Sequence, residues 1–365
     1  MTWNQYLGAD LAPLLGASSP SSLNTAVIEL LRQAAANQFA VRTGRQADII
    51  MARRPDLIGL QEVFHLGCQD LPPRAGACTE PSIRTAFRDQ LSSTLTALQA
   101  RGGDYEVAAR VVNFDLRDII GMKLGLDDLR GLPFTIDGKL GLLTAYDQDV
   151  ILKRRGMVTQ PVRFSNCRRS AQGCNYAAAA KVPIPLPIGQ TSIEVKRGYV
   201  GVDAALLGRT YRFVNTHLEV PDLQPGNPAS AQVQAQQAGE LIAALGDAPQ
   251  GGQHLIVVGD FNSSPTASPP APIVSPYQRF VSAGFVDVWK AGFPTASGFT
   301  CCQDADLRNP ASKLFERIDL IFAGRPVLAE AARVDGKDPK DRTAPIEGQR
   351  LWPSDHAAVV AQLRY

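Results

Sequence analysis

Two short polar segments of this chain have residue types and a spacing that could carry out hydrolytic chemistry. Gly259-Asp260-Phe261-Asn262 comes directly after the apolar run 255–258, and Ser354-Asp355-His356 comes directly before the apolar run 357–360. Apolar runs of this length are typical of buried strands. A rigid sheet can aim carboxylate, amide and imidazole groups from its strand ends into one cleft. Such groups are the parts needed for metal-assisted hydrolysis of a phosphoester.

Three further residues occupy similar positions. Glu62 follows the run 57–61, His217 follows the run 213–216, and Asp319 opens the run 319–322. Each residue also has a simpler explanation, because Glu62 could be a surface charge, His217 a hydrogen-bonded core histidine, and Asp319 a partner of Arg317. A Gly-Asp pair after a strand is often only a turn. The functional interpretation therefore depends on the joint occurrence of these residues.

The elements that must position these side chains are mainly strands. Apolar residues at helical spacing predict helices at 23–41, 46–53, 82–99 and 229–245. Apolar and alternating runs predict strands near 56–60, 105–112, 149–152, 158–164, 192–204, 210–216, 255–258, 319–322, 327–334 and 357–363. Since strands outnumber helices, we expect two mainly antiparallel or mixed sheets packed face to face, with helices outside.

The chain is interpreted as a single domain over residues 1–365, because no stretch has the composition of a low-complexity linker. Residues 113–147 follow no clear pattern, and we interpret them as an insertion or a long elaborated loop. Residues 177–189 are apolar and rich in proline, which suits neither a helix nor a central strand and predicts a loop.

Taken together, the motifs resemble those of the endonuclease/exonuclease/phosphatase superfamily, which includes DNase I-like nucleases, inositol polyphosphate phosphatases and bacterial sphingomyelinases. The matching stretches, which run in the family's order, are Thr2-Trp3-Asn4, Leu60-Gln61-Glu62-Val63, Asn215-Thr216-His217-Leu218, Gly259-Asp260-Phe261-Asn262, Arg317-Ile318-Asp319 and Ser354-Asp355-His356. The resemblance implies an α+β fold of the DNase I type, a four-layer α/β/β/α sandwich in which helices flank two packed mixed sheets.

The resemblance also implies a divalent metal ion. Glu62 and Asp355, with Asn4, would hold the ion through oxygen atoms, the ligand type that Mg²⁺ prefers. Mn²⁺ or Ca²⁺ are alternatives to Mg²⁺. The ion would polarise the phosphoryl group and stabilise charge on the leaving oxygen.

The resemblance further implies roles for the catalytic residues. Asp319 would accept a hydrogen bond from His356 and orient it as general base for the attacking water. Asp260 would position or deprotonate that water, and which of His356 and Asp260 takes the proton stays open. Asn262 would donate to the phosphate, and a protonated His217 would bind a non-bridging oxygen or assist the leaving group.

The substrate is less well specified, although the chain is expected to be an Mg²⁺-dependent hydrolase acting on phosphoester bonds. Its net charge is only +2, yet nine basic residues and a single acidic residue, Glu194, lie between Lys153 and Arg197. This stretch is either a solvated loop face or a binding surface for polyanions. We favour a DNase I-like nuclease, with Arg197 as a further substrate contact and nucleic acid preferred over lipid.

Three alternatives remain. A sphingomyelinase or phospholipase C-like enzyme would use the apolar run 182–188 at a membrane interface, although a loop packed on the body is the favoured explanation of that run. A small-molecule phosphoesterase is the second alternative, and an inactive binding protein of the same fold is a remote third. No obligate protein partner is evident.

The six cysteines fall into close pairs, at 68 and 78, 167 and 174, and 301 and 302. Local disulfides in an oxidising compartment explain the first two pairs, whereas adjacent Cys301 and Cys302 could be free thiols or pair elsewhere. No signal peptide and no apolar run of membrane-spanning length is present. Because local disulfides form in oxidising compartments, we expect a secreted or periplasmic protein whose signal is absent from this sequence, with a cytoplasmic location as the alternative.

Overall fold

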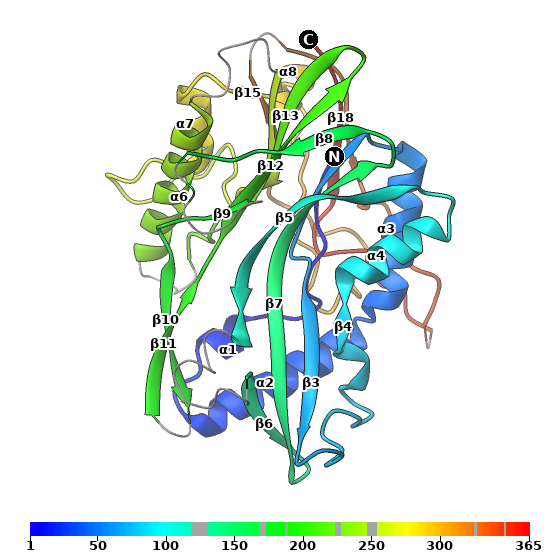
Figure 1. Ribbon diagram of the computed structural model, residues 1–365, viewed down its shortest axis with the longest axis vertical. Coiled ribbons are helices and arrows are strands. Elements are labelled where there is room, and N and C mark those ends of the chain that lie inside the picture. Colours follow the sequence, from blue (N-terminus) through cyan, green and yellow to red (C-terminus); the bar gives the residue numbers. More distant parts are fainter. Residues whose placement is uncertain are drawn as a thin grey trace.

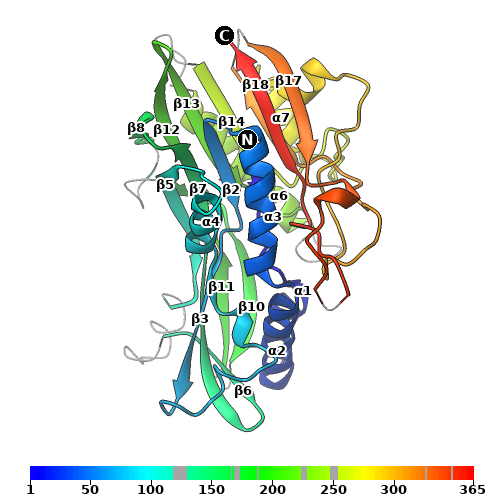
Figure 2. The same cartoon turned by 90° about the vertical axis from the view of Figure 1, so that its right-hand side faces the viewer.

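Two β-sheets packed face to face form the centre of the molecule, and helices cover their outer faces (Figures 1 and 2). The computed structural model describes residues 1–117, 130–165, 167, 173–186, 189–222, 228–246, 254–324, 327–346 and 348–365. Among the helices in those ranges, none is both long and apolar enough to cross a membrane.

The first sheet contains the earliest and latest strands of the chain. Its strands are β1 (Thr2–Asn4), β2 (Leu57–Gln61), β3 (His65–Leu71), β4 (Arg88–Asp89), β5 (Tyr105–Asp115), β6 (Leu132–Ile136), β7 (Lys139–Arg154), β17 (Leu328–Asp335) and β18 (Ala358–Arg364). The strand order is β17-β18-β1-β2-β7-β3-β4, and β5 and β6 also pair with β7. The β1–β2 pair is parallel and the other pairs are antiparallel, so the sheet is mixed.

The second sheet is also mixed. It comprises β8 (Val158–Pro161), β9 (Gly173–Asn175), β12 (Gly198–Leu206), β13 (Arg209–His217), β14 (His254–Asp260), β15 (Val286–Asp287) and β16 (Asp319–Ala323). The order is β15-β16-β14-β13-β12-β8, with β9 on β12 and a parallel pair at β13–β14. A separate two-stranded ribbon consists of β10 (Ala180–Leu186) and β11 (Gly189–Val195).

Helices form the outer layers. They are α1 (Ala12–Leu15), α2 (Pro20–Ala36), α3 (Phe39–Arg53), α4 (Gln90–Gln99), α6 (Ala229–Leu245), α7 (Pro276–Ser282) and α8 (Val288–Gly292), with short 3₁₀ turns η1 (Arg84–Ala86) and η2 (Pro339–Asp341). Figure 1 shows α3 and α4 on one side of the two sheets and α6 and α7 on the other. The structure therefore has the expected α/β/β/α sandwich.

Apolar side chains fill the space between the layers. Ile151 of the first sheet packs with Val200, Phe213 and Val258 of the second, all of them buried. The sheets approach closely at Gly59, where an added Cβ would lie 2.6 Å from Val258 Cγ2. This close approach lets the Asn215 amide nitrogen donate to backbone oxygens of Leu60 and Val150 across the sandwich. The two sheets are thus fixed to each other by a polar contact as well as by the core.

The prediction of a loop at 177–189 is wrong for residues 180–186, which form strand β10. Its prolines are tolerated because β10 pairs only with β11 in the described structure. Pro183 and Pro185 lie two residues apart, so the missing N–H groups point to the same side of the strand, as an open edge permits.

The interpretation of 113–147 as an insertion or loop is also corrected where the structure describes it. Residues up to Asp115 continue β5, residues 132–136 form β6, and β7 begins at Lys139. The 16-residue β7 is buried on both faces along much of its length, which removes the alternation that identifies a strand in a sequence. Residues 118–129 lie outside the described residues.

Two further boundaries differ from the predictions. The helix expected at 82–99 is confined to α4, because the preceding residues form η1 and β4, and Asp89 caps the helix by accepting from the Ser92 N–H. The helix expected at 23–41 ends at Ala36 and α3 begins at Phe39, with Gln38 between them in the left-handed region at φ +39°.

Candidate active site

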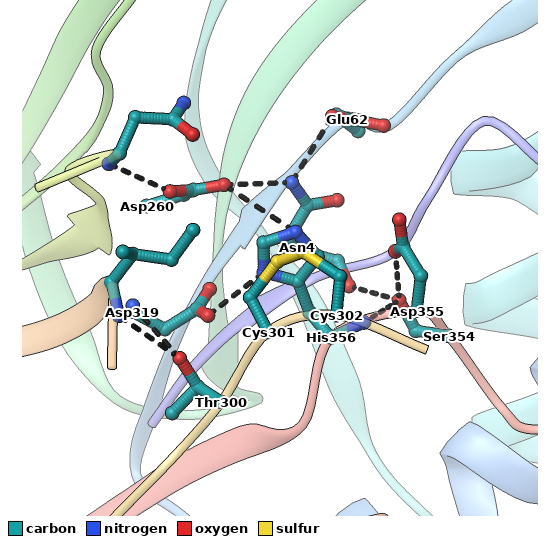
Figure 3. Close-up of a disulfide and its surroundings, with 12 residues drawn as sticks. Asn4, Glu62, Asp260, Thr300, Cys301, Cys302, Asp319, Ser354, Asp355 and His356 are labelled. Carbon is teal, nitrogen blue, oxygen red and sulfur yellow. Dashed lines mark hydrogen bonds and ion pairs between the residues drawn. A yellow bond between two sulfur atoms is a disulfide. The ribbon is translucent and has the colours of Figure 1, made fainter. Parts of the chain in front are cut away.

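Strand register brings the candidate residues to one end of the sandwich. In the first sheet, Asn4 pairs with Gln61, the residue before Glu62. In the second, Asp260 of β14 pairs with His217 of β13 on one side and with Asp319 of β16 on the other. Because β1–β2 and β13–β14 are parallel pairs, their carboxyl ends share an edge. Figure 3 shows residues from the first-sheet end close to Asp260 and Asp319.

The end of β14 depends on a glycine. Gly259 has φ +155°, and a Cβ there would lie 2.0 Å from the Thr216 backbone oxygen. Only glycine fits so close to the neighbouring strand. This position aims the next side chain, Asp260, into the site, and its Oδ1 accepts a 2.9 Å hydrogen bond from the Asn262 N–H.

His356 and Asp319 form a buried pair. The His356 Nδ1 and Asp319 Oδ2 atoms lie 2.8 Å apart (Figure 3). The backbone N–H of Asp319 donates to Thr300 Oγ1, and the Trp3 indole N–H donates to the His356 backbone oxygen. Both residues are therefore held at their backbone, and the bond at Nδ1 leaves His356 Nε2 facing the site.

Burial lowers the pKa of His356, but the carboxylates of Asp319, Asp355 and Asp260 outweigh burial and raise the pKa well above its ordinary value. One ligand atom each of Asp260, Asp319 and His356 lies within 4.8 Å of the others. Negative charge is thus concentrated around this imidazole.

Side-chain nitrogen atoms of three residues approach Asp260 Oδ2. It accepts a 3.0 Å hydrogen bond from Asn4 Nδ2, and it lies 3.5 Å from His217 Nε2 and 3.8 Å from His356 Nε2. Burial is the main cause that raises the pKa of Asp260 to about 7; the charge on His356 opposes this rise, and the charge on Asp319 adds to it. A carboxylate beside two imidazoles can orient a water molecule and exchange protons with it.

Glu62 and Asp355 offer carboxylate oxygens of the kind that bind a divalent cation. Both line the same cavity. Burial raises the pKa of Asp355 to about 6, with His356 opposing the rise and the nearby charge of Glu62 adding to it. Two carboxylates that repel each other offer hard oxygen ligands to a cation that would relieve the repulsion. The donor set fits Mg²⁺ on this chemistry.

Asn4 has a bridging position. Its Nδ2 donates to Glu62 Oε1 at 3.1 Å as well as to Asp260, while its Oδ1 accepts from the Tyr6 N–H. Glu62 itself is held at φ +51°, and its Oε2 accepts from the Leu7 N–H. The amide of Asn4 therefore positions two carboxylates, and its role as a metal ligand stays a prediction.

His217 is buried beside Arg197. Arg197 Nη1 lies 3.1 Å from His217 Nδ1, and because a guanidinium can only donate, this ring nitrogen is the acceptor. Burial, followed by the charges of Arg197 and His356, holds the pKa of His217 well below its usual range. His217 is thus neutral in the free protein, and its protonation in a complex stays a prediction. Asn262 Nδ2 donates to the Leu218 backbone oxygen and lies 3.2 Å from His217 Nε2.

Two buried acids beside the site were missed by the sequence analysis. Asn113 Nδ2 donates to Asp147 at 3.2 Å and to Asp149 at 2.9 Å, while the Oδ1 atom of each aspartate is buried without a partner among the described residues. Burial raises the pKa of Asp147 to about 6. Their signal was two aspartates leading into the apolar run 150–152. Asp147 was the last residue of the region interpreted as a loop, and Asp149 was the first residue of a predicted strand.

All six cysteines form disulfides, Cys68–Cys78, Cys167–Cys174 and Cys301–Cys302. The first two pairs confirm the expected local pairing. The vicinal pair lies beside His356 (Figure 3). The residues on either side of this disulfide contact the site. Thr300 Oγ1 accepts a hydrogen bond from the Asp319 N–H, and the Gln303 N–H donates to the Asp355 backbone oxygen.

The basic stretch from Lys153 to Arg197 is partly neutralised by acids from elsewhere in the chain. Of its seven described basic residues, four have carboxylate partners: Lys153 with Glu106, Arg154 with Asp56, Arg155 with Asp104 and Glu106, and Arg197 with Glu219. Arg168 and Arg169 lie outside the described residues. Acidic residues from other parts of the chain thus balance part of the positive charge of this stretch.

Comparison with known proteins agrees with this architecture. The sequence matches the Endonuclease/Exonuclease/phosphatase family over residues 1–356. No curated protein matches it.

Solved structures share the fold at low identity. An endonuclease/exonuclease/phosphatase from Beutenbergia cavernae is 20% identical with a TM-score of 0.50, covering 88% of this chain and 66% of its own. A mannosyl-6-phosphatase from Bacteroides thetaiotaomicron is 18% identical with a TM-score of 0.51, covering 90% and 92%. A family protein from the same organism is 17% identical with a TM-score of 0.51, covering 90% of each chain. This chain spans just under two thirds of the first protein. Because the family match covers residues 1–356, the chain belongs to the endonuclease/exonuclease/phosphatase family.

Proposed function

We propose that this protein hydrolyses phosphodiesters with a divalent metal ion, Mg²⁺ in the first instance. The observation that carries the proposal is the convergence on Asp260 Oδ2 of His217 Nε2 at 3.5 Å, His356 Nε2 at 3.8 Å and the Asn4 amide at 3.0 Å. The Asn4 amide links this centre to Glu62. Water-activating and metal-binding groups are therefore contiguous.

The proposed reaction is attack of water on phosphorus. A new P–O bond forms to the water oxygen, the ester P–O bond breaks, and the released alcohol oxygen acquires a proton. Asp319 orients His356 through Nδ1, so that Nε2 and Asp260 Oδ2 face the water, and either Asp260 Oδ2 or the Nε2 of neutral His356 accepts the one proton that the water loses. The Asn262 side chain and the neutral His217, which Arg197 holds, contact the phosphoryl oxygens.

Glu62 and Asp355 would hold the divalent ion, with Asn4 as a further candidate ligand. When bound, the ion would polarise the phosphoryl group and stabilise charge on the leaving oxygen.

A nuclease specificity stays a prediction. Its support is the basic stretch, in which four of the seven described basic residues are paired with acids. A nuclease needs unpaired cations along the phosphate backbone. A secreted or periplasmic location remains the proposal, supported by three disulfides, which persist in oxidising compartments.

The test is hydrolysis of bis(p-nitrophenyl) phosphate, supercoiled plasmid and sphingomyelin liposomes, each in Mg²⁺ and in EDTA. We expect diester hydrolysis that EDTA abolishes and that His356→Ala lowers by several orders of magnitude. Plasmid cleavage with the same two controls would establish a nuclease. A folded wild-type protein inert towards all three substrates in Mg²⁺ and Mn²⁺ would refute the proposal and favour a binding protein of this fold.

A further inference from the structure

A cavity of about 600 Å³ lies directly beside the candidate active site. Its walls include residues of α1, α2, β3, β6, β7 and the β10–β11 ribbon, and Figure 1 shows α1, α2, β6 and the ribbon at the end of the molecule opposite the chain termini. This volume is in the range of pockets that hold small-molecule ligands.

The walls are apolar because the elements around them turn alternate side chains inward. In the ribbon, Ile184, Leu186 and Ile193 line the cavity, whereas Lys181 and Pro183 are exposed. The opposite wall includes Leu143 and Ala145 of β7. The described part of the apolar run proposed for a membrane interface, residues 182–186, therefore packs on the body as a strand, and Ile184 and Leu186 line the cavity.

The cavity reaches the end of the active site where the metal ligands are proposed. Glu62 and Asp355, the proposed ligands, line the same cavity as Leu143 and Ile184. A phosphoester whose phosphorus lies at Glu62 and Asp355 thus has an apolar chamber within reach of one of its substituents.

The charges at the polar side of the cavity are mainly negative. Five acidic side chains and two basic ones line it: Asp10, Glu62, Asp147, Asp222 and Asp355, with Lys196 and Arg197. A polyanionic backbone would be repelled there. A substrate with a single phosphate group, neutralised by the divalent ion, and an uncharged chain matches both the charge and the apolar walls.

We propose that the substrate is a phosphodiester carrying one aliphatic chain, and that this chain enters the cavity bounded by β7 and the β10–β11 ribbon. The inference deepens the proposed function and depends on it for the position of the phosphate. The chain's contribution is apolar burial, which is worth about 0.8 kcal/mol, or about fourfold in binding, for each methylene group.

The first experiment measures kcat/KM in Mg²⁺ for a homologous series, from methyl to octyl p-nitrophenyl phosphate, at concentrations where every ester is monomeric. We expect kcat/KM to rise about fourfold per added methylene until the chain fills the cavity. Equal kcat/KM across the series, in protein that hydrolyses the methyl ester in Mg²⁺ and not in EDTA, would overturn the inference and leave the proposed function intact.

Two variants place bulk in the cavity from different elements. Ala145→Phe on β7 and Ile184→Trp on β10 should each reduce the octyl-to-methyl ratio of kcat/KM at least tenfold. The ratio is the readout because any general loss of activity cancels in it. Leu140→Phe is the matched control, since Leu140 lies on the same strand but is 38% exposed and does not line the cavity. A ratio unchanged in both cavity variants, or lowered equally in the control, contradicts the inference.

Binding without turnover separates the two proposals. Dodecylphosphonate titrated into His356→Ala with Mg²⁺ should bind with a negative heat-capacity change, the marker of apolar burial, whereas methylphosphonate should not. Such binding in a protein that hydrolyses no diester would support the cavity assignment while the proposed reaction fails. If dodecylphosphonate binds no more tightly than methylphosphonate, the cavity takes no chain. Plasmid cleavage that dodecylphosphonate does not inhibit would likewise count against the assignment and favour a nuclease.

Discussion

His356 and Asp319 approach within 2.8 Å at Nδ1 and Oδ2, although 37 residues separate them in the sequence and both side chains are buried. The bond fixes the imidazole so that Nε2 points to Asp260. An asparagine at 319 would keep the shape but present an amide that does not hold the same tautomer. We predict that Asp319→Asn lowers kcat by about 10³–10⁴-fold, the loss seen when an orienting carboxylate is neutralised in a hydrolase.

The measurement is steady-state kinetics with circular dichroism to verify folding. Asp335→Asn is a suitable control, because Asp335 is also a strand residue paired with a cation, Arg53, but belongs to β17 and not to the site. Near-normal activity of Asp319→Asn would remove Asp319 from the mechanism.

Glu62 is predicted to determine metal affinity. Glu62→Gln keeps an oxygen and the size of the side chain but removes the charge. We therefore expect the Mg²⁺ concentration for half-maximal activity to rise about 10–100-fold. Loss of a residue that only supports a metal ligand already has an effect of this size. A Mg²⁺ titration, followed by activity and by thermal stability, measures this. Glu316→Gln, an exposed glutamate, should leave both titrations unchanged. Equal titration curves for Glu62→Gln and wild type would exclude Glu62 as a ligand.

Asp147 is predicted to destabilise the protein at neutral pH. Burial raises the pKa of Asp147 from 3.8 to about 6, so the folded state is penalised where the carboxylate is charged, above about pH 6. The penalty fades as pH falls from 6 and is absent below 3.8, where both folded and unfolded states are protonated.

We therefore expect Asp147→Asn to raise the unfolding free energy by about 1–3 kcal/mol at pH 7.5 and to have little effect at pH 3.5. Urea unfolding at the two pH values measures the difference. Asp137→Asn, at an exposed turn between β6 and β7, is the control. A stability difference that does not vary with pH would contradict the electrostatic explanation.

The disulfides allow a fourth prediction. Cys68 and Cys78 are ten residues apart. Closing a loop of that length lowers the conformational entropy of the unfolded chain, which stabilises the folded protein by about 3 kcal/mol. The double variant Cys68→Ala/Cys78→Ala should lose about this amount in urea unfolding. A thiol titration of the denatured, unreduced wild type should find no free thiol. Two or more free thiols would instead point to a reducing compartment.

The sequence predicted features whose cause is local. β14 and β18 were recognisable because short apolar runs end or begin at polar residues, and α6 was recognisable by its spacing. The structure brings Glu62, His217, Asp260, Asp319, Asp355 and His356 to one end of the sandwich, as the motifs suggested. Their individual roles stay predictions.

Features with distant causes could not be predicted. The partners of the basic stretch are remote in sequence, as with Arg155 and Asp104, which are 51 residues apart. β7 lost its alternation because both faces are buried. The cavity is assembled from α1, β7 and the β10–β11 ribbon, and no single segment of the sequence carries its signature.

The place of β1 between β2 and β18 affects when the candidate site can form during synthesis of the chain. The Trp3 indole is bonded to His356, 353 residues later, and Asn4 bridges Glu62 and Asp260. A ribosome needs roughly 20–70 s to add that many residues. β1 can pair with β2 early in synthesis, but the contact of Trp3 with His356 must wait through this interval, so the candidate site is incomplete until His356 has been added.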